Sequence, residues 1–191
     1  MANSAKVRFG LKNVHYAPMH VSEAGVVSWD TPLRFPGAVN LDMAPQGDTN
    51  TFYADDVAYY TSTRNDGYQG DLEVALVPDH FAINVLAEKL DSTDKVQVEY
   101  ADVESNPFAL LFQISDDVTG TLFVMYNCTC TRPNTTGKTL DNSKTPNTEK
   151  LTITASPMAD GKVKARTTAE TTETVRQNWF KQVWVPGTSE V

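Results

Sequence analysis

Three histidines and two cysteines are the side chains in this sequence best suited to bind a metal or attack a substrate, and their spacing suits neither task. His15 and His20 are five residues apart, so they would face opposite sides of a strand and do not form a zinc-binding pair. His80 stands alone. Cys128 and Cys130 form no CxxC motif and would point to one strand face. We therefore expect both thiols to be small buried apolar groups.

Paired carboxylates are the other candidate for acid–base chemistry. Asp55-Asp56 and Asp116-Asp117 are adjacent in the sequence, and neighbours in a strand point to opposite faces, whereas a general acid and a general base must converge on one substrate. The sequence contains no calcium-binding loop, no phosphate-binding glycine loop and no GxSxG motif. A cupin-type barrel enzyme would need clustered histidines. We expect no catalytic residue, no metal site and no cofactor site, and hence a protein that is not an enzyme.

Composition predicts one folded domain. The chain has 191 residues, 40% of them apolar and 21% charged, and no linker-like stretch divides it, so we expect a single domain over residues 1–191. The net charge of −8 disfavours sequence-specific binding to nucleic acid. No apolar run approaches the roughly 20 residues that span a bilayer. With two cysteines and no basic-then-apolar leader, we expect synthesis in a reducing cell interior.

Alternating apolar and polar residues predict strands with one buried and one exposed face. Branched and aromatic side chains fill these runs, as is typical of a pleated surface. The alternating apolar sets are Val7/Phe9/Leu11, Leu72/Val74/Leu76, Phe108/Leu110/Phe112/Ile114, Leu122/Val124/Tyr126/Cys128, Leu151/Ile153/Ala155 and, more weakly, Val163/Ala165.

Turn sequences indicate how the strands connect. Asn65-Asp66-Gly67 predicts a tight hairpin between the run ending at Thr63 and the run beginning at Tyr68, and Asp160-Gly161 predicts another between residues 151–155 and 162–166. Ser115–Gly120 is a longer polar turn that would close a third hairpin. We therefore expect a mainly β fold, an antiparallel sandwich or barrel.

One clear helix interrupts the strands. Pro78-Asp79 is a start signal, and apolar residues then recur on one stripe at helical spacing as far as Leu90. The stripe consists of Phe81, Val85, Leu86 and Leu90. A second, shorter helix is expected from about Thr174 to Phe180.

Two long polar stretches are predicted to be loops. Both stretches, Met43–Thr51 and Arg132–Thr148, are long and polar. Loops longer than about 12–15 residues are uncommon in compact domains and tend to be functional or mobile. In a self-assembling protein they would be contacts between subunits. For Arg132–Thr148, an ordinary surface loop without a partner is an equal alternative.

Clustered aromatic side chains point to a covered surface. Four of them flank Asp55-Asp56, and the C-terminal run Asn178–Pro186 holds two tryptophans and a phenylalanine. Either the chain's own core or a neighbouring subunit must cover the C-terminal run. The candidate inter-subunit contacts are Gln46, Gly47, Asp48, Thr49, Asn50, Phe52, Tyr53, Tyr59, Tyr60, Trp179, Phe180 and Trp184.

Seven segments, in this order, carry a resemblance to a known family that extends over essentially the whole chain. They are Phe9–Ala17 (FGLKNVHYA), Gly47–Tyr60 (GDTNTFYADDVAYY), Gly67–Asp79 (GYQGDLEVALVPD), Pro107–Phe112 (PFALLF), Tyr126–Pro133 (YNCTCTRP), Leu151–Pro157 (LTITASP) and Asn178–Phe180 (NWF). The sequence resembles the phi13-type major tail proteins, the tail tube proteins of long-tailed bacteriophages.

The resemblance implies a structural role in a virion. Members of this family have a β-sandwich subunit with a flanking helix, and their strands join across subunits in hexameric rings that stack into a tube. The implied partners are other copies of the chain, the tape measure protein in the lumen, and the tail tip and tail terminator proteins at the ends. DNA would pass through without sequence-specific binding, and the net charge of −8 suits an acidic or neutral inner wall. The implied location is the phage tail, after synthesis in the bacterial cytoplasm.

Two other interpretations remain open at this point. A monomeric β-sandwich module that binds a host surface or a carbohydrate would share the strand pattern and would stay monomeric at any concentration. A tube protein of a contractile tail or a secretion system would differ in having a sheath.

Overall fold

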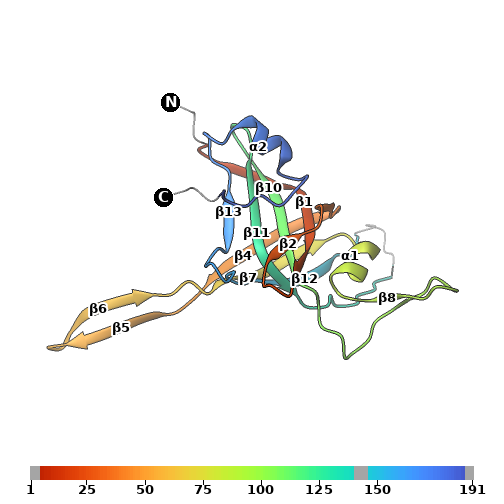
Figure 1. Ribbon diagram of the computed structural model, residues 1–191, viewed down its shortest axis with the longest axis horizontal. Helices are drawn as coiled ribbons and strands as arrows, with labels where there is room; N and C mark the ends of the chain where they lie inside the picture. Colours follow the sequence, from red (N-terminus) through yellow and green to blue (C-terminus); the bar gives the residue numbers. More distant parts are fainter. Residues whose placement is uncertain (1–4, 140–145, 188–191) are drawn as a thin grey trace.

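The computed structural model describes residues 5–139 and 146–187, and this part of the chain is mainly antiparallel β-sheet with two short helices (Figure 1). The fold class expected from the sequence is confirmed. The elements are β1 (Arg8–Val21), β2 (Val27–Trp29), β3 (Leu33–Arg34), β4 (Ala38–Gln46), β5 (Thr49–Ala54), β6 (Val57–Thr63), β7 (Gly67–Val74), α1 (Asp79–Asn84), β8 (Lys89–Leu90), β9 (Gln97–Val98), β10 (Phe108–Asp116), β11 (Thr121–Cys130), β12 (Glu149–Ala155), β13 (Lys164–Arg166) and α2 (Glu173–Asn178).

One nine-stranded sheet forms the body of the molecule. Its order is β2-β1-β10-β11-β12-β7-β4, with β3 paired to β1 and β13 paired to β11. The sheet curves so that β1 and β4, which are far apart in this order, come into contact without a hydrogen-bonded ladder between them. Two hairpins, β5–β6 and β8–β9, lie outside the sheet.

The main core lies on one face of the curved sheet. Side chains from β1, β7, β10, β11 and β12 meet there with the buried face of α1. Phe81 of α1 is at its centre, because its ring packs edge-to-face against Tyr16, Phe35 and Phe108 at centroid distances of 4.8, 4.8 and 5.5 Å. Such pairs are favoured by the aromatic quadrupole beyond their area of contact. The helix therefore holds the curved sheet around a single aromatic cluster.

A second core lies on the opposite face of β10 and β11. Their outward side chains Leu111, Val124 and Tyr126 are buried against Trp179 and Val183, which follow α2. The Trp179 indole donates a hydrogen bond to the Phe123 carbonyl at 3.2 Å. The prediction of one buried and one exposed face is therefore wrong for β10 and β11. In β10 the C-terminal segment covers the face that alternation left for solvent, whereas in β11 that face, with Phe123 and Met125, lies in the main core.

Alternation also failed at the beginning of the chain and after β7. Val7 and Phe9 were predicted to face a core together with Leu11, but Val7 is exposed and Phe9 is 66% exposed. Leu76 lies beyond the end of β7 and is exposed as well. The period of two is present at these positions, but no part of the described chain covers the apolar face.

The two predicted Asp-Gly-type hairpins are wrong. β6 pairs with β5, while β7 pairs with β4 and β12, so Asn65-Asp66-Gly67 joins two different sheets. Asp160-Gly161 does lie in a tight turn, with the Gly161 N–H donating to the Met158 carbonyl at 2.8 Å. However, β12 and β13 both pair with β11 rather than with each other. After β12 the chain turns at Asp160-Gly161, and β13 then pairs with another part of β11.

The third predicted hairpin is confirmed. β10 and β11 pair up to Ile114↔Thr121, and the Asp116 carboxylate closes the turn between them. It accepts hydrogen bonds from the Gly120 N–H at 2.7 Å and the Val118 N–H at 3.0 Å. These hydrogen bonds lower the pKa of Asp116, and the one from the Gly120 N–H has the largest effect. Asp116 is therefore a turn residue rather than a member of an acid–base pair.

The predicted helices are found, with shorter bounds. α1 begins at Asp79 as expected but ends at Asn84, and Leu90 lies in β8 and is half-exposed. Ala87 has a φ of 59°, a left-handed conformation that turns the chain away from the helix axis. α2, at Glu173–Asn178, agrees with the expected second helix.

The two predicted loops have different outcomes. The prediction of a loop at residues 43–51 is wrong, because β4 extends to Gln46 and β5 begins at Thr49. In the other stretch, residues 132–139 and 146–148 have no regular structure, and residues 140–145 lie outside the described part.

Truncating Phe81 to alanine is expected to destabilise the fold by about 3–5 kcal/mol, because the removed ring leaves a cavity among three aromatic neighbours. Equilibrium unfolding in urea would measure the loss. Leu76→Ala is the control, since Leu76 is exposed and its truncation should change the free energy of unfolding by less than about 0.5 kcal/mol. Equal losses in the two variants would contradict the placement of α1 in the main core.

Candidate functional site

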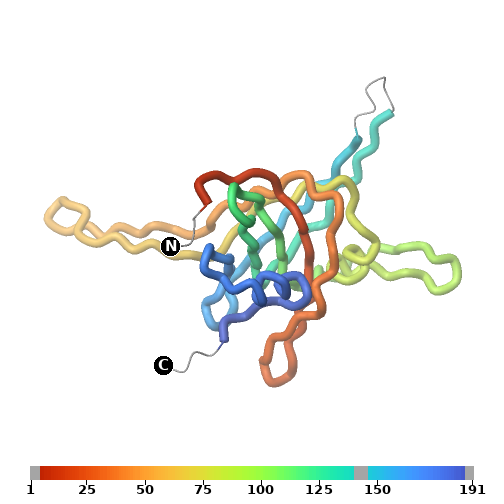
Figure 2. Tube along the Cα trace, turned by 90° about the horizontal axis from the view of Figure 1, so that it is seen from above, coloured from red at the N-terminus to blue at the C-terminus, as the bar shows by residue number. Residues whose placement is uncertain are grey.

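The β5–β6 hairpin, residues 49–63, which we call the arm, is exposed along most of its length. It projects away from the body of the sheet in both views (Figures 1 and 2). Its strands continue outward from β4 and β7, which pair from Ala38↔Val74 to Gln46↔Gly67. The arm is therefore the far half of one long antiparallel ribbon, and its near half is built into the sheet.

Backbone hydrogen bonds carry this ribbon across the junction with the sheet. The Arg64 N–H donates to the Asp48 carbonyl at 2.9 Å, and the Asp66 N–H donates to the Gln46 carbonyl at 2.9 Å. Gly47 lies between these two bonds with a φ of 145°, and a Cβ there would overlap the Arg64 carbonyl. Glycine thus allows the two strands to stay close where the ribbon leaves the sheet.

Two aspartates form the tip of the arm. Asp55 and Asp56 have φ angles of 52° and 59°, and they connect the pair Ala54↔Val57. Two consecutive left-handed residues are the geometry of a type I′ hairpin turn, which Asp tolerates better than most residues do. The sequence-based placement of this carboxylate pair within a strand is therefore wrong, and both charges lie at the outer end of the arm.

Large apolar side chains cover much of the arm's surface and are open to solvent. Phe52, Tyr53, Tyr59 and Tyr60 are 61%, 67%, 72% and 63% exposed. Phe52 and Tyr60 are cross-strand partners and share one face. The opposite face carries threonine pairs, and Thr49 and Thr63 have their hydroxyl oxygens 3.3 Å apart. The arm thus has one face with the Phe52–Tyr60 pair, which we call the aromatic face, an opposite face with the threonine pairs and Tyr53, and an acidic tip.

Isolated hairpins of this kind are marginally stable in water. The described chain packs no second layer against the arm, and both outer edges of the β5–β6 pair are unpaired. Burying a side chain the size of Phe52 contributes about 1.5–3 kcal/mol. A partner that covers the aromatic face or pairs with an edge would therefore order the arm and stabilise it.

The structure divides the sequence-predicted contact residues into two groups. Those between Gln46 and Tyr60 lie along the arm and at its base. Trp179, Phe180 and Trp184 lie together at the second core: Trp179 is buried and stacks on Trp184 at a centroid distance of 6.0 Å. The sequence left open whether the chain itself covers this run, and for Trp179 the chain's own strands do.

Sequence reasoning missed one contributor to the arm's apolar surface. Val57 follows the tip turn and is exposed. It could have been found from the Asp-Asp pair, because a two-residue turn there makes Ala54 and Val57 cross-strand partners.

The histidines lie at three separate places. His15 stacks on Phe180 at 4.6 Å, and its pKa is lowered mainly by burial. The His20 Nε2 lies 2.9 Å from an Asp30 carboxylate oxygen, and the His80 Nδ1 lies 2.7 Å from the Tyr16 hydroxyl. Within residues 5–139 and 146–187, no three His, Cys, Asp or Glu side chains are grouped so as to hold a metal ion.

The two thiols are part of the main core. Cys128 and Cys130 are buried and unpaired with each other, as the sequence predicted. Burial raises the pKa of each thiol to about 12. Thiolate is the reactive form of cysteine, so neither residue is poised for chemistry at neutral pH.

No family model and no curated protein matches the chain. A solved structure, the anti-feeding prophage cap (AFP tube terminating cap), is similar with a TM-score of 0.42 and 10% identity, over 87% of this chain and 97% of that chain. This value is too low to establish a common fold. Neither helix in the described part of the chain has the length and apolar character needed to cross a membrane.

Both thiols are expected to be unreactive toward a thiol-specific disulfide reagent at pH 8 while the protein is folded, because burial disfavours the thiolate and excludes the reagent. Both should react in denaturant. Absorbance of the released thiol would follow the reaction. Fast labelling of the folded chain would contradict the placement of Cys128 and Cys130 in the core.

Proposed function

We propose that this chain is a structural subunit of a bacteriophage virion, the major tail protein, whose hexameric rings stack into the tail tube. The observation that carries the proposal is the arm: a hairpin rooted in the sheet, with four exposed aromatic side chains and no cover from residues 5–139 and 146–187 of its own chain. A surface of this kind is typical of one that another molecule buries.

The contact that we propose is head-to-tail. The arm of one copy binds a different surface of the next copy without a reciprocal exchange, which makes the contact heterologous. Heterologous contacts repeat from copy to copy and produce rings or helical filaments. The resemblance to phi13-type major tail proteins, which includes residues 47–60 of the arm, supports the same conclusion.

Open sheet edges support assembly as well. In the described part of the chain, β4 pairs with β7 alone, so the other edge of β4 is free. The first residues of β1 pair with β10 on one side only. Joining such edges between subunits would satisfy their backbone groups and remove the risk of irregular aggregation.

The remaining roles are those that the resemblance to phi13-type major tail proteins implies. The lumen would hold the tape measure protein and later conduct DNA, and tail tip and tail terminator proteins would bind the two ends. With a net charge of −8, an acidic or neutral lumen wall would let DNA pass without adhering to it. The virion tail is accordingly the proposed location.

One alternative is favoured by the same aromatic residues. Exposed tyrosines such as Tyr53 and Tyr59 could stack on sugars, as in a monomeric module that binds a host surface or carbohydrate. Such a module would remain monomeric at any concentration, whereas a tube subunit assembles. A tube protein of a contractile tail or secretion system is a closer relative of the proposal and would differ in having a sheath.

Removing the arm tests the proposal. Residues 49–63 would be replaced by Asn-Gly, which can connect Asp48 to Arg64 because these two residues are already hydrogen-bonded. The shortened chain is expected to fold with an unchanged thermal midpoint, since the arm contributes nothing to either core, and to form no tubes in negative-stain images.

The matched control shortens the other free hairpin. Replacing residues 92–95 by Asn-Gly keeps the Asp91 N–H to Val96 carbonyl bond and should leave assembly intact. Tubes of normal length from the armless chain would contradict the proposal. So would an intact chain that remains monomeric at high concentration when supplied with a tail tip.

A further inference from the structure

The curved sheet leaves a groove where β1 and β4 come together, which we call the β1–β4 groove. It has a volume of about 490 Å³, within the range of cavities that receive a ligand group. Its walls are the partly buried side chains of Leu11, Leu41 and Met43, and main-core residues such as Phe112 and Phe123 lie beneath. An opening in the sheet therefore gives access to apolar side chains of the core.

The rim of this groove is apolar and uncovered. Phe9 of β1 is 66% exposed and Val39 of β4 is 56% exposed, and both line the groove. Phe9 belongs to the alternating set that the sequence assigned to a buried face. A face with the pattern of a buried strand and no cover in the described part of its own chain is typical of a surface that a second molecule covers.

Positive charge surrounds the same opening. The Arg8 guanidinium lies 5.6 Å from the centre of the Phe123 ring, and the Lys164 Nζ lies 3.9 Å from the centre of the Tyr68 ring. A neighbouring hollow shares Arg8 with this groove and adds Arg166. In residues 5–139 and 146–187, none of these three cations has a carboxylate within ion-pair distance.

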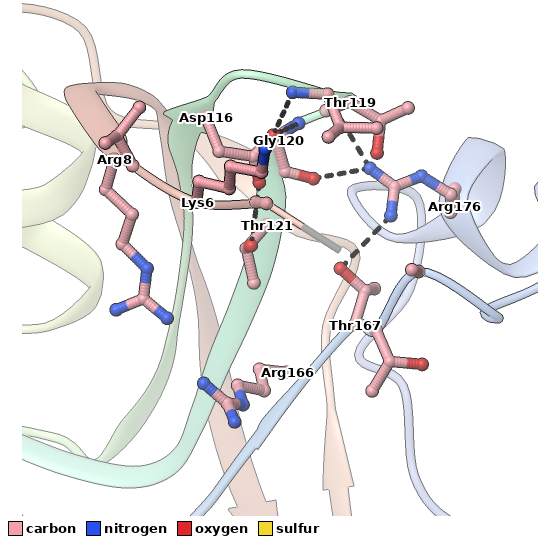
Figure 3. Close-up of a pocket in the computed structure, with 14 residues that line it drawn as sticks. Lys6, Arg8, Asp116, Thr119, Gly120, Thr121, Arg166, Thr167 and Arg176 are labelled. Carbon is pink, nitrogen blue, oxygen red and sulfur yellow. Dashed lines mark hydrogen bonds between the residues drawn. The ribbon is translucent and has the colours of Figure 1, made fainter. Parts of the chain in front are cut away.

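The acidic groups nearby do not neutralise this rim. Figure 3 shows Asp116 directed into its own turn, where it accepts hydrogen bonds from Gly120 and Thr121. The Arg176 guanidinium is held in place by a hydrogen bond to the Gly120 carbonyl at 2.6 Å, which distinguishes it from Arg8 and Arg166. Asp42 is the carboxylate on the wall of the groove itself. The rim thus remains a local concentration of positive charge on a chain whose net charge is −8.

The arm has the opposite character. Residues 48–63 contain Asp48, Asp55 and Asp56 and no lysine or arginine. Two of these carboxylates form the tip, and Phe52, Tyr60 and neighbouring aromatic residues follow directly behind them. The acidic tip of the arm is complementary to the basic rim of the groove. The aromatic residues behind the tip are complementary to the apolar residues of the groove.

We propose that the tip of the arm of one copy binds in the β1–β4 groove of another copy, with Asp55 and Asp56 at the Arg8–Lys164 rim and the aromatic face over Phe9 and Val39. The occupant is a second copy because the arm is held by the β4–β7 ladder in a direction that leads away from its own body (Figures 1 and 2). This inference rests on the proposed function and names the receiving surface for the arm. Apolar contact would supply affinity, and charge would select the partner and its register.

A charge exchange tests this pairing. Asp55→Lys with Asp56→Lys reverses the tip, and Arg8→Glu with Lys164→Glu reverses the rim. Each pair alone is expected to raise the critical concentration for assembly by about tenfold or more, because like charges then face each other. The four substitutions together are expected to restore assembly to within a few-fold of the unchanged chain.

Two controls separate charge from other effects. Asp55→Asn with Asp56→Gly removes the tip charge and keeps the type I′ turn, so its defect should be smaller than that of the reversal. Lys89→Glu with Lys95→Glu makes the same charge change as the rim variant in and near β8 and should not affect assembly. Thermal unfolding of each variant confirms that the body is folded.

A cross-link tests proximity directly, even for variants that assemble poorly. A chain with Asp56→Cys would be mixed with a chain carrying Val39→Cys and oxidised, and the buried native thiols give little background. A heterodimer far in excess of either homodimer is expected. If unchanged chains assemble but the cross-link does not form and the four substitutions do not rescue, the receiving surface is wrong and the proposed function stands. If unchanged chains never assemble, the proposed function itself is wrong.

Discussion

Strand pairing without closure is the constraint on which the rest of this structure depends. The sheet curves far enough for β1 and β4 to touch, but no ladder joins them. Every unpaired strand edge leaves backbone donors and acceptors without fixed partners. The chain covers one face of the sheet with α1 and part of the other with the C-terminal segment. Within the part of the chain that the structure describes, the β1–β4 opening and the arm stay uncovered, and these two features are the ones that we propose to meet in assembly.

Burial is distributed so that the body is rigid where the arm is attached. β10 and β11 are buried on both faces, which is unusual for antiparallel strands and typical of a sheet with helices on each side. β7, which carries the arm outward, is paired on both edges by β4 and β12. Gly70 in β7 has no side chain, and a Cβ there would overlap the Asp42 carbonyl of β4. The close contact between these strands fixes the direction in which the arm leaves the sheet.

The polar side chains of the body have structural roles. Asp116 closes a turn, Arg176 ties α2 to that turn, and His80 contacts the hydroxyl of a core tyrosine. The carboxylates at the arm tip and the cations at the groove rim form no ion pair within residues 5–139 and 146–187. These are the charges that we propose to meet between two copies, and charge complementarity of this kind selects a partner.

Local sequence determined the features that depend on neighbours in the chain. Alternation gave the strands and the buried thiols, Pro78-Asp79 marked the start of α1, and residues 115–120 formed the predicted turn, because each of these signals acts over a few residues. Tertiary structure decided which strands pair and which apolar faces are covered. The turns at Asn65–Gly67 and Asp160–Gly161 have suitable hairpin residues, yet β7 and β13 found partners elsewhere. Alternation assigned Phe9 to a buried face and left Leu111 on an exposed one, but Leu111 is buried by the distant C-terminal segment and Phe9 is exposed. Pairing and burial depend on segments far apart in the chain, and no local pattern encodes which of them will meet.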